Sequence, residues 1–173
     1  MLRQPLWQFS ADSPAKNNDM KNFNELVAES AKNITEILPW DLEERYEENP
    51  SLLLLDIREP YEFEAMHIKG SLNVPRGVVE TACEWNYEET VAQLVEARDK
   101  EVIVACRSGN RSIFVCEIMQ KMGYKNIVSL KTGLRGWSDY EQPLFDKDEN
   151  EVDEDTAIDY FTANIRKDQM APK

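Results

Sequence analysis

Residues 101–112 read Glu-Val-Ile-Val-Ala-Cys-Arg-Ser-Gly-Asn-Arg-Ser, and this stretch guides the interpretation of the rest of the chain. The run Val102–Val104 is β-branched and apolar, which is typical of a strand buried in a parallel sheet. It stops at Cys106, and the polar loop that follows leads into a segment with helical patterning, residues 111–122. Cys106 is therefore predicted at the carboxyl end of a buried strand, next to the N-terminus of a helix.

This predicted position favours a reactive cysteine. Backbone N–H groups converge at a helix N-terminus and the helix dipole favours negative charge there, while the thiolate is the nucleophilic form of cysteine. Arg107 and Arg111 would add positive charge that also attracts an anionic substrate. The alternative is that Cys106 is a small buried hydrophobic residue, as free cysteine often is. A purely structural cysteine would not need this loop chemistry.

Strand-like and helix-like segments alternate along the chain. Strands are predicted at residues 33–37, 52–56, 72–74, 101–105 and 126–130, and helices at residues 22–32, 39–46, 61–66, 87–97 and 111–122. Alternation of this kind predicts crossover connections and an α/β fold, with a small central parallel sheet and helices on both faces. Ligands bind beyond the carboxyl ends of the strands in such sheets, which is where Cys106 is expected.

Three motifs of the chain, in this order, resemble those of the rhodanese-like sulfurtransferases. They are LLLDIREPYEF with HIKGSLNVPRG at residues 53–63 and 67–77, CRSGNRS at residues 106–112, and GYKNIVSL with TGLRGW at residues 123–130 and 132–137. The resemblance covers about residues 34–144 and is strongest in the cysteine loop. Met66 and Thr132 stand where the family often has glycine, so local turn geometry is expected to differ at these two positions.

The resemblance implies a sulfurtransferase that moves a sulfane sulfur from thiosulfate or a persulfide donor to a thiol or cyanide. Cys106 would be the catalytic nucleophile and would carry the sulfur as a persulfide. Convergent N–H groups in the loop would hold the negatively charged terminal sulfur, as an oxyanion hole holds its oxygen. The residues expected to bind substrate are Arg107, Ser108, Gly109, Asn110, Arg111, Ser112 and Arg76. For Arg76, the role of an ordinary exposed arginine is an equal alternative.

Three residues outside the loop are expected to support the site. Asp56 and Arg58 lie at the end of the first buried strand, and Arg58 is interpreted as an ion-pair partner of a neighbouring carboxylate rather than a substrate ligand. His67 is the only histidine of the chain. In the resembled motif this position is mainly structural, with a hydrogen-bonding role. No metal and no organic cofactor are expected, because one histidine and three scattered cysteines do not supply zinc-ligand spacing.

Other functions fit the same residues less well or stay open. A non-catalytic persulfide carrier or regulatory protein-binding module is the main alternative to an enzyme. Cysteine phosphatases place five residues between cysteine and arginine to embrace a phosphate, whereas four residues separate Cys106 from Arg111. The smaller loop suits a sulfur atom better, so phosphatase or arsenate reductase activity is the less favoured interpretation. Cys116 is expected to pack in the core. For Cys83, attack on a Cys106 persulfide to form a disulfide is a less favoured interpretation.

Composition bounds the partners of the protein. The chain has 173 residues, and 20 Lys and Arg against 33 Asp and Glu give a formal charge of −13. This charge disfavours nucleic acid and anionic membrane surfaces as partners, so attraction of a small anionic sulfur donor must be local. A protein sulfur acceptor is the second expected class of partner. Three unpaired cysteines indicate a reducing compartment, with the cytoplasm as default, and the oligomeric state stays open.

Three regions are predicted along the chain. Residues 1–21 are polar after a short apolar start and are expected to form a flexible leader, in which Met20 is an alternative start. Residues 22–145 are expected to form the rhodanese-like domain with its N-terminal helix. Residues 146–173 are predicted as an acidic linker and a C-terminal helix, capped by Asp155, that docks on the core or on a second subunit.

Overall fold

The computed structural model describes residues 20–172, so the predicted leader at residues 1–21 lies almost wholly outside the described part of the chain. The elements in chain order are α1 (Phe23–Ala31), β1 (Thr35–Ile37), α2 (Pro39–Glu48), β2 (Leu53–Asp56), α3 (Pro60–Ala65), β3 (Leu72–Asn73), the 3-10 helix η1 (Arg76–Val78), α4 (Val79–Ala82), α5 (Ala92–Val95), β4 (Glu101–Ala105), α6 (Asn110–Lys121), β5 (Asn126–Leu130), α7 (Gly133–Asp139), α8 (Glu154–Phe161) and the 3-10 helix η2 (Lys167–Gln169).

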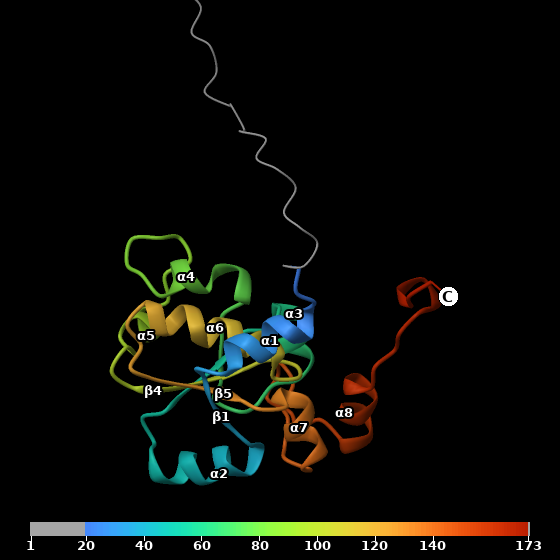
Figure 1. The fold of residues 1–173 in the computed structure, drawn as a ribbon. Helices are drawn as coiled ribbons and strands as arrows, with labels where there is room; N and C mark the ends of the chain where they lie inside the picture. Colours follow the sequence, from blue (N-terminus) through green and yellow to red (C-terminus); the bar gives the residue numbers. More distant parts are fainter. Residues whose placement is uncertain (1–19, 173) are drawn as a thin grey trace, which may run out of the picture.

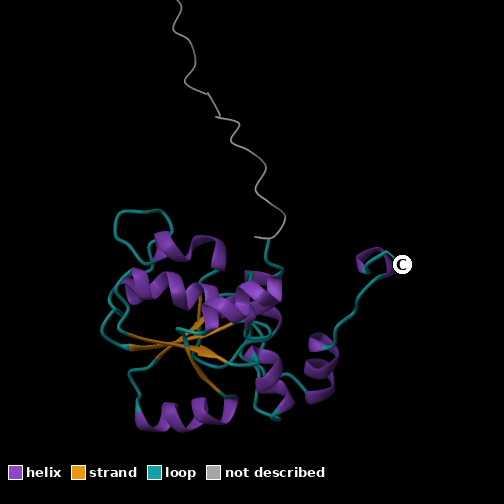
Figure 2. Ribbon diagram, in the orientation of Figure 1, coloured by secondary structure: helices purple, strands orange, loops and turns teal. Residues whose placement is uncertain are grey.

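The five strands form one parallel sheet in the order β1-β5-β4-β2-β3, with helices above and below it (Figures 1 and 2). The α/β fold predicted from the sequence, with helices on both faces, is confirmed. The central strand β4 pairs with β2 and β5, and Val104 lies opposite Leu55 and Ser129. The two strands β2 and β4 are buried along almost their whole length, as expected for a sheet covered on both sides.

Two apolar clusters, one on each face of the sheet, hold the helices in place. Side chains of α1, α4, α5 and α6 pack with one cluster, and those of α2, α7 and α8 pack with the other. Because side chains alternate across a strand, Val104 and Ala105 of β4 belong to different clusters. Burial on both faces therefore fixes the end of β4, and with it the position of the next residue, Cys106.

One predicted helix is largely absent. Residues 87–97 were expected to be helical, but only Ala92–Val95 form a helix, so this prediction is wrong for the first part of the segment. The Thr90 hydroxyl accepts a hydrogen bond from the Tyr87 N–H at 3.0 Å and donates to the Glu84 carbonyl at 2.7 Å. A side chain that bonds the backbone in this way competes with helix formation, and it closes a loop instead.

The C-terminal segment packs on the same domain. Ala157 and Phe161 of α8 are buried in the cluster that also contains Leu134 and Trp137 of α7. The helix is capped by Asp153, which accepts a hydrogen bond from the Thr156 N–H at 3.0 Å, so the predicted cap at Asp155 is wrong by two residues. No helix within residues 20–172 is long and apolar enough to cross a membrane.

Candidate active site

Cys106 directly follows β4 and begins the loop that enters α6 at Asn110. Only 1% of its surface is exposed. Its thiol donates to the Ser112 hydroxyl, with a sulfur-to-oxygen distance of 3.5 Å. The cysteine is therefore held in a defined orientation at the carboxyl end of the sheet, beside the first turn of a twelve-residue helix.

Two glycines shape the loop around Cys106. Gly109 caps α6 with a φ of +85°, a left-handed conformation that favours glycine, and a β-carbon there would lie 2.8 Å from the Thr132 backbone nitrogen. At Gly133 a β-carbon would collide with the Cys106 carbonyl oxygen. The N–H of Leu134 donates to that carbonyl at 2.9 Å. The start of α7 thus packs against the backbone of the cysteine loop and holds it in place.

Several backbone N–H groups of the loop are free. Within residues 20–172, those of Arg107, Ser108 and Gly109 have no hydrogen-bond acceptor. The first N–H groups of α6 also lack partners inside the helix, as at any helix start. The loop therefore offers adjacent donors next to the cysteine, in a place where the helix dipole favours negative charge.

Two buried serine hydroxyls are connected to Cys106 through hydrogen bonds. Ser112 Oγ donates to the Gly109 carbonyl at 2.9 Å and lies 2.8 Å from Ser129 Oγ. Both serines are fully buried. Ser112 was among the predicted site residues, but Ser129 was not, and its only signal in the sequence is a serine inside the apolar strand Asn126–Leu130.

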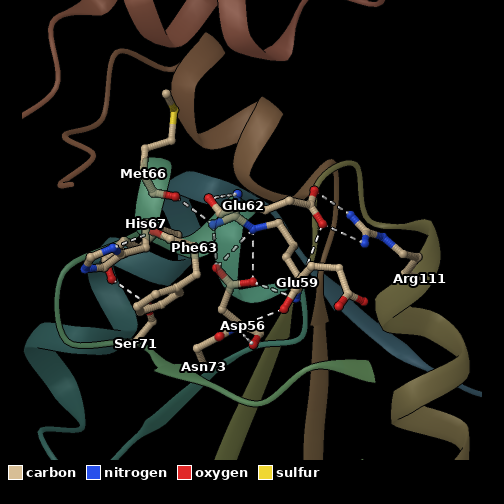
Figure 3. A network of polar contacts seen from close by, with 11 residues as sticks. Asp56, Glu59, Glu62, Phe63, Met66, His67, Ser71, Asn73 and Arg111 are labelled. Carbon is tan, nitrogen blue, oxygen red and sulfur yellow. Dashed lines mark hydrogen bonds and ion pairs between the residues drawn. The ribbon is translucent and has the colours of Figure 1, made fainter. Parts of the chain in front are cut away.

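Arg111 is brought to the site together with the carboxylate of Glu62, a contact that was not predicted from the sequence. Its guanidinium forms two hydrogen bonds of 3.1 Å with the two oxygens of Glu62 on α3 (Figure 3). Burial opposes the charge of Glu62, but the hydrogen bonds from Arg111 and from the Glu59 N–H hold the pKa of Glu62 below its ordinary value. Burial likewise opposes the charge of Arg111, and the hydrogen bonds and charge of Glu62 raise its pKa.

Asp56 and Arg58 form a fully buried ion pair next to this contact. Arg58 Nη2 lies 2.7 Å from the Asp56 carboxylate and 2.7 Å from the Met66 carbonyl, and Arg58 Nη1 donates to the Glu62 carbonyl at 3.2 Å. Asn73 Nδ2 donates to the carbonyls of Asp56 and Arg58 at 3.0 Å (Figure 3). Each charged group of this network has partners within the protein, and the network ties β2, α3 and β3 together.

The other predicted anion ligands lie against aromatic side chains. Arg107 Nη2 donates to the Tyr160 carbonyl at 2.8 Å, and its guanidinium lies over the rings of Tyr160 and Phe161 in α8. Arg76 is exposed and lies over the Phe114 ring, 5.2 Å from its centroid. Neither guanidinium forms a hydrogen bond with the Cys106 sulfur. Ser108 is exposed and Asn110 half-buried at the loop surface.

His67 links the site region to the acidic segment that precedes α8. Its ring stacks on Phe63 with centroids 4.0 Å apart, and Nδ1 lies 3.0 Å from the Phe63 carbonyl. Nε2 lies 3.7 Å from the Glu149 carboxylate. The backbone groups of His67 and Phe145 exchange two hydrogen bonds of 2.8 and 2.9 Å. His67 therefore contacts the protein on several sides.

The remaining cysteines are buried and unpaired. Burial raises the pKa of Cys116, and burial also raises the pKa of Cys83. Both thiols are therefore held in the neutral form, which is the less nucleophilic one. Within residues 20–172, no group of three or more His, Cys, Asp or Glu side chains is arranged to hold a metal ion.

Comparisons with known proteins extend these observations. A family model described as Rhodanese-like domain matches residues 38–140. The "Putative sulfur carrier protein YrkF" of Bacillus subtilis is 31% identical over 119 residues, which are 69% of this chain and 59% of that protein. The "Putative thiosulfate sulfurtransferase, mitochondrial" of Schizosaccharomyces pombe is 37% identical over 103 residues, which are 58% of this chain and 72% of that protein.

A solved structure agrees with the fold. The polysulfide-sulfur transferase homodimer from Wolinella succinogenes has a TM-score of 0.56 and 24% identity, covering 72% of this chain and 87% of that chain. This likeness shows the fold alone. The chain spans less than two thirds of the Bacillus subtilis relative, and α8 lies beyond the residues that the family model matches.

Proposed function

Because the chain belongs to the family of rhodanese-like domains, we propose that it is a sulfurtransferase that works through a persulfide on Cys106. The observation that carries the proposal is the loop geometry. Cys106 begins a loop with free N–H groups at Arg107, Ser108 and Gly109, at the N-terminus of α6. Such donors stabilise a negative charge that develops on a bound atom, and the terminal sulfur of a persulfide carries that charge.

The reaction proceeds in two displacements. The Cys106 thiolate attacks the sulfane sulfur of the donor; the new Sγ–S bond forms while the donor's S–S bond breaks, and the leaving group keeps the electron pair. With thiosulfate as donor, sulfite leaves. A nucleophile such as cyanide or a thiol then attacks the terminal sulfur, and the electron pair of the Sγ–S bond returns to Cys106.

Positive charge near the sulfur comes mainly from one arginine and from backbone dipoles. Arg111 is held beside the loop by Glu62, so its charge is fixed in place but partly compensated. The guanidinium groups of Arg107 and Arg76 lie over aromatic rings, and that of Arg107 also donates to the Tyr160 carbonyl. The proposed donor is therefore a small anion or a persulfide whose reactive sulfur enters the cradle of loop N–H groups, rather than an anion clamped by three free arginines.

A turnover assay tests this function. The protein is incubated with thiosulfate and cyanide, and thiocyanate is followed over many equivalents. We expect repeated turnover by the wild-type protein and by Cys83→Ala, and none by Cys106→Ser, because only Cys106 lies in the loop. Full activity in Cys106→Ser would refute the assignment of the nucleophile. The same assay is repeated with glutathione persulfide as donor.

A carrier function is the second candidate, and one comparison favours it. The Bacillus subtilis relative carries the name of a sulfur carrier protein. A carrier would accept one sulfur on Cys106 and release it only to a particular protein, whereas an enzyme would cycle with small molecules. One equivalent of loading without thiocyanate turnover would therefore support the carrier function over the enzymatic one.

A further inference from the structure

Ser129 is the one polar side chain whose position on β5 is not explained by the fold. It lies opposite Val104, two residues before Cys106, and its strand neighbours Val128 and Leu130 are buried apolar residues. Ser129 itself is fully buried. Burial of a hydroxyl without a hydrogen bond costs free energy, so an alanine or valine would suit this strand better unless the hydroxyl serves a purpose.

The hydrogen-bond directions around Ser129 follow from counting hydrogens. A serine hydroxyl has one hydrogen and two acceptor positions. Ser112 uses its hydrogen for the Gly109 carbonyl at 2.9 Å, so in its contact with Ser129, at 2.8 Å, Ser112 is the acceptor and Ser129 donates. The second acceptor position of Ser112 receives the Cys106 thiol at 3.5 Å. All three hydrogen-bonding positions of Ser112 are then occupied.

We propose that Ser129 is a positioning residue for Cys106 that acts through Ser112. By donating to Ser112 Oγ, Ser129 holds that oxygen next to the sulfur in every state of the cysteine. When the sulfur carries a proton, Ser112 accepts from it. When the sulfur becomes an anion, Ser112 rotates its hydrogen from the Gly109 carbonyl to the sulfur, and its oxygen stays in place. The inference deepens the proposed function, on which it rests.

This arrangement assigns different roles to the two serines. Ser112 touches the sulfur, and its hydroxyl can donate a hydrogen bond to the anionic sulfur in addition to those of the loop N–H groups. Ser129 lies one hydrogen bond further away and keeps the Ser112 oxygen from turning toward another partner. Because hydrogen bonds in a buried chain reinforce one another, loss of the Ser129 hydroxyl weakens the donor that Ser112 presents to the anionic sulfur.

Reactivity of the cysteine toward a small alkylating reagent tests the proposal independently of sulfur transfer. The rate of iodoacetamide labelling at Cys106, identified by peptide mass, is measured from pH 5 to pH 10 for the wild-type protein and for Ser129→Ala. We expect Ser129→Ala to label roughly two- to fivefold more slowly at neutral pH, less than the loss of a whole hydrogen bond to a charged group would give, with the pH midpoint of labelling moved upward. Ser129→Thr, which keeps the hydroxyl, should keep the wild-type midpoint.

Two further variants separate positioning from general packing. Ser138→Ala removes a buried serine of α7 whose side chain forms no hydrogen bond with the Cys106 loop, and it should leave the labelling profile unchanged. In a Ser112→Ala background, Ser129→Ala should have no further effect, because its action passes through Ser112. Unfolding by urea confirms that each variant is folded under the labelling conditions.

The outcomes are distinct. An unchanged midpoint in Ser129→Ala, or the same decrease with and without Ser112, would overturn the positioning role. A wild-type protein that labels faster than Ser129→Ala, as expected, and yet transfers no sulfur is another outcome. That result would overturn the proposed function but would support the role of Ser129. A slower rate and raised midpoint that vanish in the Ser112→Ala background are the result that the proposal requires.

Discussion

Single residues around the site carry charges whose partners the structure defines, and Glu62 is the clearest example. Its pKa lies below the ordinary value of 4.5, since the hydrogen bonds from Arg111 and the Glu59 N–H outweigh the effect of burial. A carboxyl group whose pKa is lower in the folded than in the unfolded state stabilises the folded state at pH values above its unfolded pKa. This contribution disappears as pH falls through the folded pKa.

Glu62→Gln should therefore lower the free energy of unfolding at pH 7 by about 2 kcal/mol, the scale of hydrogen bonds to a charged group. The difference between wild type and variant should begin to shrink below pH 4.5, where Glu62 of the unfolded chain becomes protonated, and should disappear once pH falls through the lower pKa of folded Glu62. Urea unfolding at pH 7 and pH 3 measures both values. Glu64→Gln, on the exposed side of the same helix, is the matched control, and an equal loss there would show that the Arg111 contact is not responsible.

Thr132 is a residue whose backbone conformation disagrees with its type. Its φ is +65°, a left-handed conformation that costs a non-glycine residue about 1–2 kcal/mol. The sequence already placed Thr132 where the resembled family often has glycine. We expect Thr132→Gly to raise the free energy of unfolding by about 0.5–1 kcal/mol, after the extra freedom of glycine in the unfolded chain is subtracted. Thr132→Ala keeps the unfavourable conformation, and a gain of the same size in that variant would contradict the explanation.

Tyr46 buries a hydroxyl that has no hydrogen-bond partner within the described residues. Burial also raises the pKa of Tyr46 to about 12. Because an unpaired buried hydroxyl is unfavourable, Tyr46→Phe should leave the free energy of unfolding unchanged or raise it by about 1 kcal/mol. Tyr124 provides the contrast, since its hydroxyl donates to the Leu94 carbonyl at 2.6 Å. Tyr124→Phe should lose about 1 kcal/mol, and a loss of that size in Tyr46→Phe would reveal a partner that Tyr46 binds in solution.

At the scale of elements, the attachment of α8 to the cysteine loop is the feature that the family match does not include. Arg107 joins the two through the Tyr160 carbonyl and the rings of Tyr160 and Phe161. Arg107→Ala should therefore loosen α8 locally by about 1–2 kcal/mol. Amide hydrogen exchange in residues 154–161 should become roughly 5–30-fold faster.

Arg135→Ala is the control for this exchange experiment. The Arg135 side chain is exposed and has only a 4.0 Å ion pair with Asp139 on its own helix. Its removal should leave exchange in α8 unchanged. If α8 exchanges at the wild-type rate in Arg107→Ala, then the apolar contacts of Ala157 and Phe161 alone hold the helix.

The same scale shows what sequence patterns can predict. The strand before Cys106, the loop and the helix after it were predicted closely, because β-branched runs and glycine carry strong local signals. The helix at residues 87–97 was predicted too long, since a single side chain, Thr90, closes a loop there. The pairing of Glu62 with Arg111 and the role of Ser129 were not predicted, because they depend on contacts with residues that are far away in the sequence.

At the scale of the whole molecule, the chain has a formal charge of −13, which repels anions, although its site is proposed to receive them. The described part of the chain resolves this conflict locally. The carboxyl end of the sheet collects free N–H groups, the start of α6 and the Arg111 guanidinium at one cysteine. Both apolar clusters and the ion pair of Asp56 with Arg58 serve to hold these parts in register.

The most direct test of the central claim is the intact mass of the reduced protein before and after exposure to a sulfane-sulfur donor, with peptide mapping of any added sulfur. Thiosulfate is used first and glutathione persulfide second, and cyanide is added after each. We expect one sulfur atom on Cys106, absent from Cys83 and Cys116, that cyanide removes as thiocyanate. No added sulfur from either donor, or sulfur that is found equally on Cys106→Ser, would contradict a persulfide mechanism at this loop.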